Sequence, residues 1–194
     1  MSDIMDRINS VFNNPRLRGL FLKSRLPLGI IFSVWLLFLL DPAWFYPGLA
    51  VSICGAFLQA WCMSTIRTKK KLTTTGPYMF VRNPMYLSRF LLVLGIILMT
   101  GCIWLIVVYV GVYYFYMVNR VKREEKILSE LFGADYASYC ADVHPYIPGF
   151  VRFDALKLVS LNRESIRENH VLENLAVVFC GYVVLYIFAF VWRI

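Results

Sequence analysis

Five long apolar runs dominate this sequence and limit what it can fold into. They cover residues 26–40, 47–66, 84–100, 101–119 and 174–192, and Arg89 is the only charged residue within them. A helix needs about 20 apolar residues to cross roughly 30 Å of hydrocarbon, and it satisfies its own backbone hydrogen bonds in lipid. The runs therefore predict an all-α, polytopic integral membrane protein with about five transmembrane helices. The first run can extend past Asp41-Pro42 to the aromatic residues Trp44-Phe45-Tyr46, which leaves the third span as the shortest.

The composition supports the same conclusion. Of 194 residues, 59% are hydrophobic and only 16% are charged, whereas a soluble domain is about half apolar and a quarter charged. A chain of this length cannot bury so much apolar surface within itself, because small domains have a high ratio of surface to volume. The composition excludes disorder, a fibrous repeat and most soluble folds.

The positive charges predict how the chain is oriented in the membrane. The net charge is +8, and all but one of the 20 Lys and Arg residues lie before residue 26 or within 67–89 and 120–167. The alternate connections, near 41–46 and 100–101, carry none. Basic loops favour the cytoplasmic side, so we expect the N-terminus and both basic segments in the cytoplasm and the C-terminus outside. For a bacterial protein this is the inner or cell membrane, and nucleic-acid binding is not expected because no basic soluble module exists.

Metal chemistry is not expected either. The five cysteines form no CxxC pair, and His144 and His170 have no metal-ligand spacing. The sequence also lacks a glycine-rich phosphate loop.

The segment from Thr73 to Tyr86 is the first candidate for polar chemistry. Gly76-Pro77 and Asn83-Pro84 are turn signals, which predict Asn83 as a helix N-cap and Pro84 in the first helical turn. Exposed backbone N–H groups at such a helix start can hold a carboxylate. Aromatic and hydrogen-bonding side chains, suited to a flat polar cofactor, crowd the same segment: Tyr78, Phe80, Arg82, Asn83 and Tyr86. A simple loop with two turns and a cap is the alternative.

The second candidate segment continues the fourth apolar run. Neither Gly nor Pro occurs between Val112 and Phe132, so the helix is predicted to leave the membrane unbroken and to end near Gly133. Arg120 and Glu124 are four residues apart and share a face. Arg120 either extends to the interface as an ordinary snorkelling side chain or meets an anion that arrives from the membrane. An apolar stripe suited to docking follows: Ile127, Leu128, Leu131 and Phe132.

In order and spacing, these motifs resemble the isoprenylcysteine carboxyl methyltransferase family and its relatives, which include phospholipid N-methyltransferases. The family pattern is G-x-Y-x-x-x-R-H-P-x-Y, a helix hairpin, R-x-x-x-E-E, then F-G-x-x-Y-x-x-Y and a late proline. The resemblance covers roughly residues 45–150. The matching residues are Gly76, Tyr78, Arg82, Asn83, Pro84, Tyr86, Arg120, Glu124, Glu125, Phe132, Gly133, Tyr136, Tyr139 and Pro148.

The resemblance implies an S-adenosylmethionine-dependent enzyme that methylates a lipid or isoprenoid acceptor at the cytoplasmic interface. The expected cofactor-binding residues are Gly76, Tyr78, Arg82, Asn83, Pro84, Tyr86, Glu124, Glu125 and Tyr136. Arg120 matches the arginine that faces the acceptor, and Arg67 is the candidate for a second one, with Lys69 as its competitor. An anionic carboxylate or phosphate acceptor is favoured, and a prenylcysteine, a polyprenyl phosphate and a lipid amine all stay open. Oligomeric state is not predicted.

The chain departs from the family pattern in two places. Asn83 replaces the usual histidine, and asparagine hydrogen-bonds without titrating near neutral pH, so a proton-transfer role there is not expected. The chain also continues past the late proline. We expect one membrane domain, 1–194, with a cytoplasmic arm at 1–25, a methyltransferase-like core at 26–149, and an interfacial segment plus an extra transmembrane helix at 150–194.

Two other functions stay open. One is an NADPH-dependent membrane reductase related to the sterol reductases, which share a similar C-terminal stretch but need more than five helices to enclose their substrates. The other is a non-catalytic membrane scaffold of the same fold.

Overall fold

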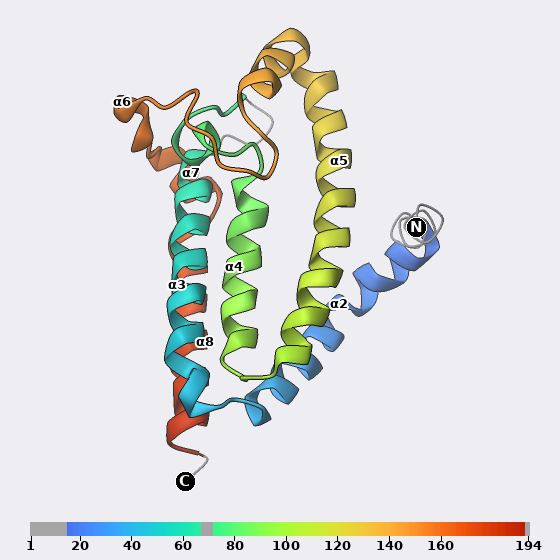
Figure 1. The fold of residues 1–194 in the computed structure, drawn as a ribbon, viewed down its shortest axis with the longest axis vertical. Coiled ribbons are helices and arrows are strands. Elements are labelled where there is room, and N and C mark those ends of the chain that lie inside the picture. The colour runs from blue at the N-terminus through green and yellow to red at the C-terminus, as the bar shows by residue number, and fades with distance from the viewer. Residues whose placement is uncertain (1–14, 67–71, 193–194) are drawn as a thin grey trace.

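The computed structural model describes residues 15–66 and 72–192, and every regular element within them is a helix. The prediction of an all-α protein is confirmed. Long helices run roughly along one direction, except that α2 slants away from the others (Figure 1). The long helices are α2 (Pro15–Phe38), α3 (Pro42–Thr65), α4 (Pro84–Leu98), α5 (Ile103–Asp142) and α8 (Val171–Phe190). The short ones are η1 (Gly76–Met79), α6 (Ala155–Leu158) and α7 (Arg163–Glu168).

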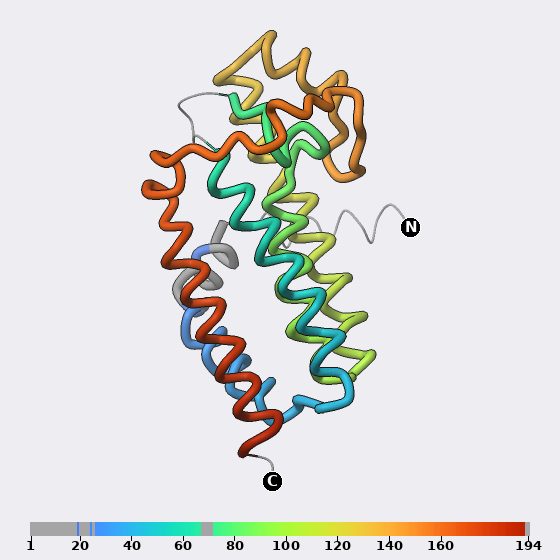
Figure 2. The backbone as a smooth tube through the Cα atoms, turned by 90° about the vertical axis from the view of Figure 1, so that its left-hand side faces the viewer, coloured from blue at the N-terminus to red at the C-terminus, as the bar shows by residue number. Residues whose placement is uncertain are grey.

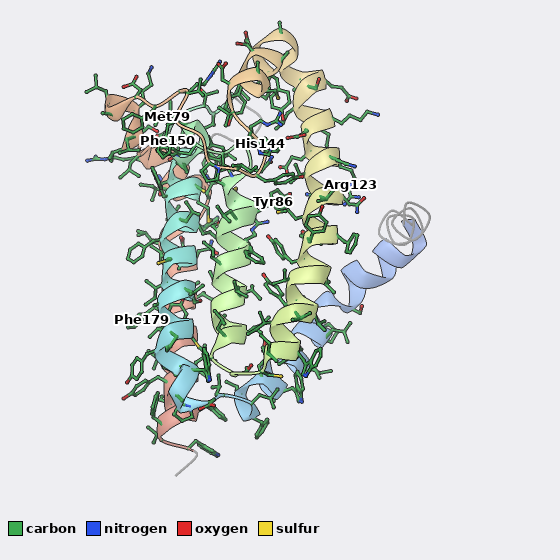
Figure 3. All side chains as sticks on the ribbon, in the orientation of Figure 1. Met79, Tyr86, Arg123, His144, Phe150 and Phe179 are labelled. Carbon is green, nitrogen blue, oxygen red and sulfur yellow. The ribbon has the colours of Figure 1, made fainter. Side chains whose placement is uncertain are left out.

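Each of the five apolar runs forms a helix. Three helices, α3, α5 and α8, are long and apolar enough to cross a membrane, while α4 and the Leu26–Phe38 part of α2 are shorter apolar helices. Large apolar side chains face outward, as expected for contact with lipid: Trp104 is 75% and Phe179 is 68% exposed, and Phe179 points away from the bundle (Figure 3). The chain is an integral membrane protein.

The two ends of the bundle differ in character. At one end, the α2–α3 and α4–α5 connections meet the C-terminal end of α8 (Figures 1 and 2), and Leu40, Phe45, Met99 and Ala189 form a buried apolar cluster. The opposite end carries η1 and residues 143–170 (Figure 2), and we call it the loop end. The polar side chains of the predicted site lie at the loop end. The apolar cluster therefore holds the helices together at the end of the bundle opposite the site.

Small residues let α3 and α4 pack closely. A Cβ atom added at Gly55 would lie 2.8 Å from Leu92 Cα and 2.8 Å from the Ser88 carbonyl oxygen, both on α4. Nearby, the buried Ser52 hydroxyl donates to the Leu92 carbonyl (2.8 Å) and lies 2.8 Å from the Tyr182 hydroxyl of α8. This contact sets the position of α4, which carries part of the site.

Replacing Gly55 with leucine should therefore separate α3 from α4. We expect the substitution to destabilise the protein by about 3 kcal/mol, which lowers the midpoint of thermal unfolding in detergent by about 5–10 °C. Gly181→Leu on α8 is the control, because no atom lies within 4 Å of the added Cβ there. Equal midpoints for the two variants would contradict the close packing of α3 against α4.

The predicted helix end at Gly133 is partly wrong. Gly133 does interrupt the helix, with φ of 48° and ψ of −119°, but the chain resumes helical geometry and continues to Asp142. Positive φ costs glycine little, and here it folds the last part of α5 back toward the bundle (Figure 1). This reversal brings Tyr136 and Tyr139 over the site.

Candidate functional site

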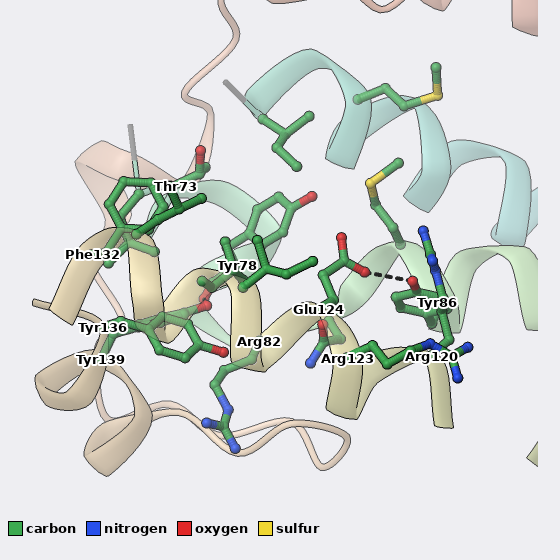
Figure 4. A pocket seen from close by; sticks show the side chains of 18 of the residues that line it. Thr73, Tyr78, Arg82, Tyr86, Arg120, Arg123, Glu124, Phe132, Tyr136 and Tyr139 are labelled. Carbon is green, nitrogen blue, oxygen red and sulfur yellow. Dashed lines mark hydrogen bonds between the residues drawn. The ribbon is translucent and has the colours of Figure 1, made fainter. Parts of the chain in front are cut away.

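A cavity of about 480 Å³ lies at the loop end, between the ends of α3, η1, α4 and α5. Its volume is in the range of sites for small organic ligands. Most of its wall is apolar. The charged and hydroxyl groups come from the loop before α4, which includes η1, from the first turns of α4, and from residues 120–139 of α5 (Figure 4). Tyr86 projects from α4 toward α5 (Figure 3). The cavity therefore joins residues that are remote in sequence but belong to the two predicted motifs.

The loop before α4 is held by the last turns of α5 and by the segment that follows them. Gly76 adopts a φ of +61° at the start of η1, where glycine avoids strain. The buried Tyr139 hydroxyl donates to the Tyr78 carbonyl (2.7 Å), and the Arg82 amide donates to the His144 carbonyl (3.1 Å). The Gly149 amide donates to the Phe80 carbonyl in the same loop (2.9 Å). These bonds fix the loop rigidly enough to present its side chains to the cavity.

Tyr78 brings a buried hydroxyl without a partner to this cavity. Its side chain is only 7% exposed, and the hydroxyl has no hydrogen-bond partner among the described residues. Burial raises the pKa of Tyr78 well above its usual range, an effect that the positive charge of Arg89 opposes. The phenol stays protonated and is available as a donor. Buried polar groups are almost always satisfied, so a bound ligand is the natural partner for this hydroxyl.

Glu125 organises the start of α4 from behind the cavity wall. Its Oε1 accepts from the Asn83 amide (3.4 Å) and lies 3.5 Å from Arg82 Nη2. Asn83 occupies the predicted N-cap position, but its side chain makes no capping hydrogen bond, because the amide turns to Glu125 instead. The buried Arg82 Nε has no partner among the described residues. Arg82 therefore combines one fixed ion pair with one free donor.

Glu124, one residue earlier, faces the cavity itself. Its Oε2 accepts a short hydrogen bond, 2.6 Å, from the Tyr86 hydroxyl (Figure 4). The Tyr86 carbonyl accepts from the Tyr113 hydroxyl (2.6 Å), which fixes α4 against α5. Arg120 lies beside the same Tyr86 hydroxyl (Figure 4). A carboxylate, a phenol and a guanidinium thus meet at one point of the wall.

The structure brings most of the predicted site residues together. Those that line the cavity are Tyr78, Arg82, Asn83, Tyr86, Arg120, Glu124 and Tyr136. Glu125 supports two of them from outside the wall, while Gly76 and Pro84 shape the backbone and do not line it. Arg67 and Lys69 lie outside the described residues.

Several cavity residues were missed in the sequence. Helical spacing would have found some of them, because Arg89 follows Tyr86 by three positions and Arg123 follows Arg120 by three. Asn169 had no sequence signal: it lies in the C-terminal extension, where its amide donates to the Met63 carbonyl (2.8 Å) and its side chain completes the wall. Within the described ranges, no three His, Cys, Asp or Glu residues group as metal ligands.

Comparison with known proteins finds matches for the region that contributes most of this cavity. Residues 44–135 match the phospholipid methyltransferase family. The chain is also 30% identical over 113 residues to protein-S-isoprenylcysteine O-methyltransferase of Saccharomyces cerevisiae, a match that covers 52% of this chain and 47% of the relative. The chain thus spans about half the length of that curated relative. No solved structure matches the chain.

Proposed function

Because residues 44–135 match the phospholipid methyltransferase family, we propose that this membrane protein transfers a methyl group from S-adenosylmethionine to an acceptor carried by a lipid. The observation that carries the proposal is the loop-end cavity, where unpartnered donors from the loop and an acidic group from α5 surround a space of small-molecule size.

The described residues fit the cofactor. The Tyr78 hydroxyl and Arg82 Nε are buried donors that have no partner within residues 15–66 and 72–192, and they suit the carboxylate and the ring nitrogens of S-adenosylmethionine. Glu124 is an acceptor for its ammonium or ribose hydroxyl groups, and the Tyr136 ring offers an apolar face. Gly76, Pro84 and Glu125 serve by holding these groups in place.

The chemistry asks little of the protein beyond positioning. When bound, S-adenosylmethionine supplies a methyl group on a positively charged sulfur, so a carboxylate or phosphate oxygen needs no base to become a nucleophile. The cavity residues align the two reactants and exclude water, which alone contributes several kcal/mol. Arg120 holds the acceptor oxyanion beside Tyr86 as a fork of N–H donors. Arg67 is the proposed second arginine of this acceptor site.

We place the loop end of the bundle in the cytoplasm, with the N-terminus there and the C-terminus outside. The distribution of basic residues supports this orientation. It lets a polar cofactor enter from the cytosol and a prenyl or acyl chain enter from the bilayer. The acceptor we favour is anionic, because arginines exceed acidic residues around the cavity.

Calorimetry on the purified full-length protein in detergent tests the proposed cofactor. We expect S-adenosylhomocysteine, the demethylated product, to bind at about one molecule per chain, and NADPH to give no heat of binding. A membrane reductase would show the opposite preference. A scaffold would bind neither compound, and cells that carry Arg120→Ala or Glu125→Ala would then keep full function.

A further inference from the structure

Arg89 is a charged residue within the apolar helix α4, and it has no role in the function proposed above. It is the sixth residue of α4, so it lies about 7.5 Å along the helix from Pro84, farther from the loop end. Arginine within an apolar helix is costly and usually marks a functional site. The side chain nevertheless lines the same cavity as Tyr78 and Glu124. Of the α4 residues that line the cavity, Arg89 is therefore the one that lies farthest from the loop end.

The contacts of Arg89 leave its charge unbalanced. Its guanidinium lies over the Tyr86 ring, 6.0 Å from the centroid, and its positive charge reaches the Tyr78 phenol. Among the described residues, no carboxylate forms an ion pair with Arg89; the nearby acidic side chains are engaged elsewhere, Glu124 with Tyr86 and Glu125 with Arg82. The aromatic contact orients the guanidinium but does not neutralise it.

The cavity as a whole also carries excess positive charge. Arg82, Arg89, Arg120 and Arg123 line it, and Glu124 is its only acidic lining residue among those described. Glu125 offsets Arg82 from behind. S-adenosylmethionine adds a further net positive charge, because its sulfonium and ammonium outnumber its one carboxylate. A negative charge on the other reactant would offset the excess that the described residues leave.

We propose that Arg89 selects the acceptor by binding a carboxylate or phosphate oxygen of a lipid that enters from the bilayer side. This inference rests on the proposed function. A planar guanidinium backed by the Tyr86 ring suits two parallel hydrogen bonds to such an oxyanion. Arg120 on α5 lies beside the hydroxyl of the same Tyr86, so in this proposal the two arginines approach one acceptor from two helices. Arg89 is then the residue that separates anionic lipids from neutral ones.

Binding of three farnesyl probes to the full chain in detergent tests this role. The probes are farnesyl phosphate, S-farnesylthioacetate and the neutral farnesol, each titrated by thermophoresis with S-adenosylhomocysteine at saturation. We expect the wild type to prefer at least one anionic probe over farnesol by about tenfold or more, and Arg89→Gln to remove about a tenfold advantage. Arg89→Lys should restore part of it, since lysine keeps the charge without the fork. The probe that loses more identifies the acceptor group.

Two controls keep the outcome interpretable. Lys122→Gln removes the same charge from an exposed α5 position that does not line the cavity, and it should leave all three affinities unchanged. Arg89→Gln should bind S-adenosylhomocysteine within about twofold of wild type, which shows that it is folded. An unchanged preference for anions in Arg89→Gln, or an equal loss for farnesol, overturns the role of Arg89. Failure of the wild type to bind S-adenosylhomocysteine overturns the proposed function instead.

Discussion

Replacing Arg120 with glutamine is expected to lower kcat/KM for methyl transfer by about a hundredfold, the cost typical of misplacing one reactant by about 1 Å. Arg120 lines the cavity beside the Tyr86 hydroxyl, at the contact between α4 and α5. Glutamine keeps a polar side chain of moderate length but loses the charge and the fork. Methyl transfer from labelled S-adenosylmethionine, measured over a range of acceptor concentrations, gives the two kinetic constants separately.

The Arg120 variant must also be shown to retain its fold. The proposed cofactor contacts come from other residues, so its affinity for S-adenosylhomocysteine should stay within about threefold of wild type. Lys126→Gln, an exposed position on α5 outside the cavity wall, is the matched control and should transfer methyl groups at the wild-type rate. If Arg120→Gln is as active as Lys126→Gln, Arg120 does not hold the acceptor.

The second large effect is expected at Glu124. Changing it to glutamine should weaken S-adenosylhomocysteine binding by about 10- to 100-fold, because hydrogen bonds to a charged group contribute about 1.5–3 kcal/mol. Glu124 is the acidic side chain of the cavity wall and fixes Tyr86 through a 2.6 Å hydrogen bond. Without the carboxylate, the cavity arginines also repel the cationic S-adenosylmethionine. Affinity should therefore fall more for S-adenosylmethionine than for S-adenosylhomocysteine, which lacks the sulfonium charge.

Calorimetry with both ligands measures the difference. Glu130→Gln, exposed two turns farther along α5 and outside the cavity, should bind both as the wild type does. Equal affinities of Glu124→Gln and wild type for both ligands would mean that the carboxylate only holds the Tyr86 side chain in position. Tyr86→Phe distinguishes that case, because it removes the hydrogen bond to Glu124 and leaves the Glu124 carboxylate charge in place.

The apolar runs predicted the helices, and the two motifs predicted seven of the twenty residues that line the cavity. Burial of backbone groups in lipid leaves a 20-residue apolar run few alternatives to a helix, so the spans follow from local sequence. The four-residue spacing of Arg120 and Glu124 placed both on the face of α5 that lines the cavity. Gly133 does interrupt α5, but the predicted helix end there is wrong because the helix resumes and continues to Asp142.

Other features depend on contacts that no local pattern contains. Arg89 is counted among the basic residues that set orientation, and only the packing of α4 against α5 places it in the cavity. Asn169 reaches the wall because α7 and α8 return to the end of α3. The turn of Asn83 toward Glu125 likewise depends on a neighbour 42 residues away. Side chains that join distant segments are therefore what the structure adds.

Transfer of a labelled methyl group by the purified protein tests the central proposal most directly. The full chain is placed in vesicles made from a total lipid extract, supplied with S-adenosylmethionine labelled on the methyl carbon, and the lipid is extracted and counted. We predict label in the lipid phase that increases with time and falls to background with Arg120→Gln. If the wild type binds S-adenosylhomocysteine and yet leaves no label in carboxylate, phosphate or amine lipids, the proposed methyl transfer to a membrane lipid is wrong.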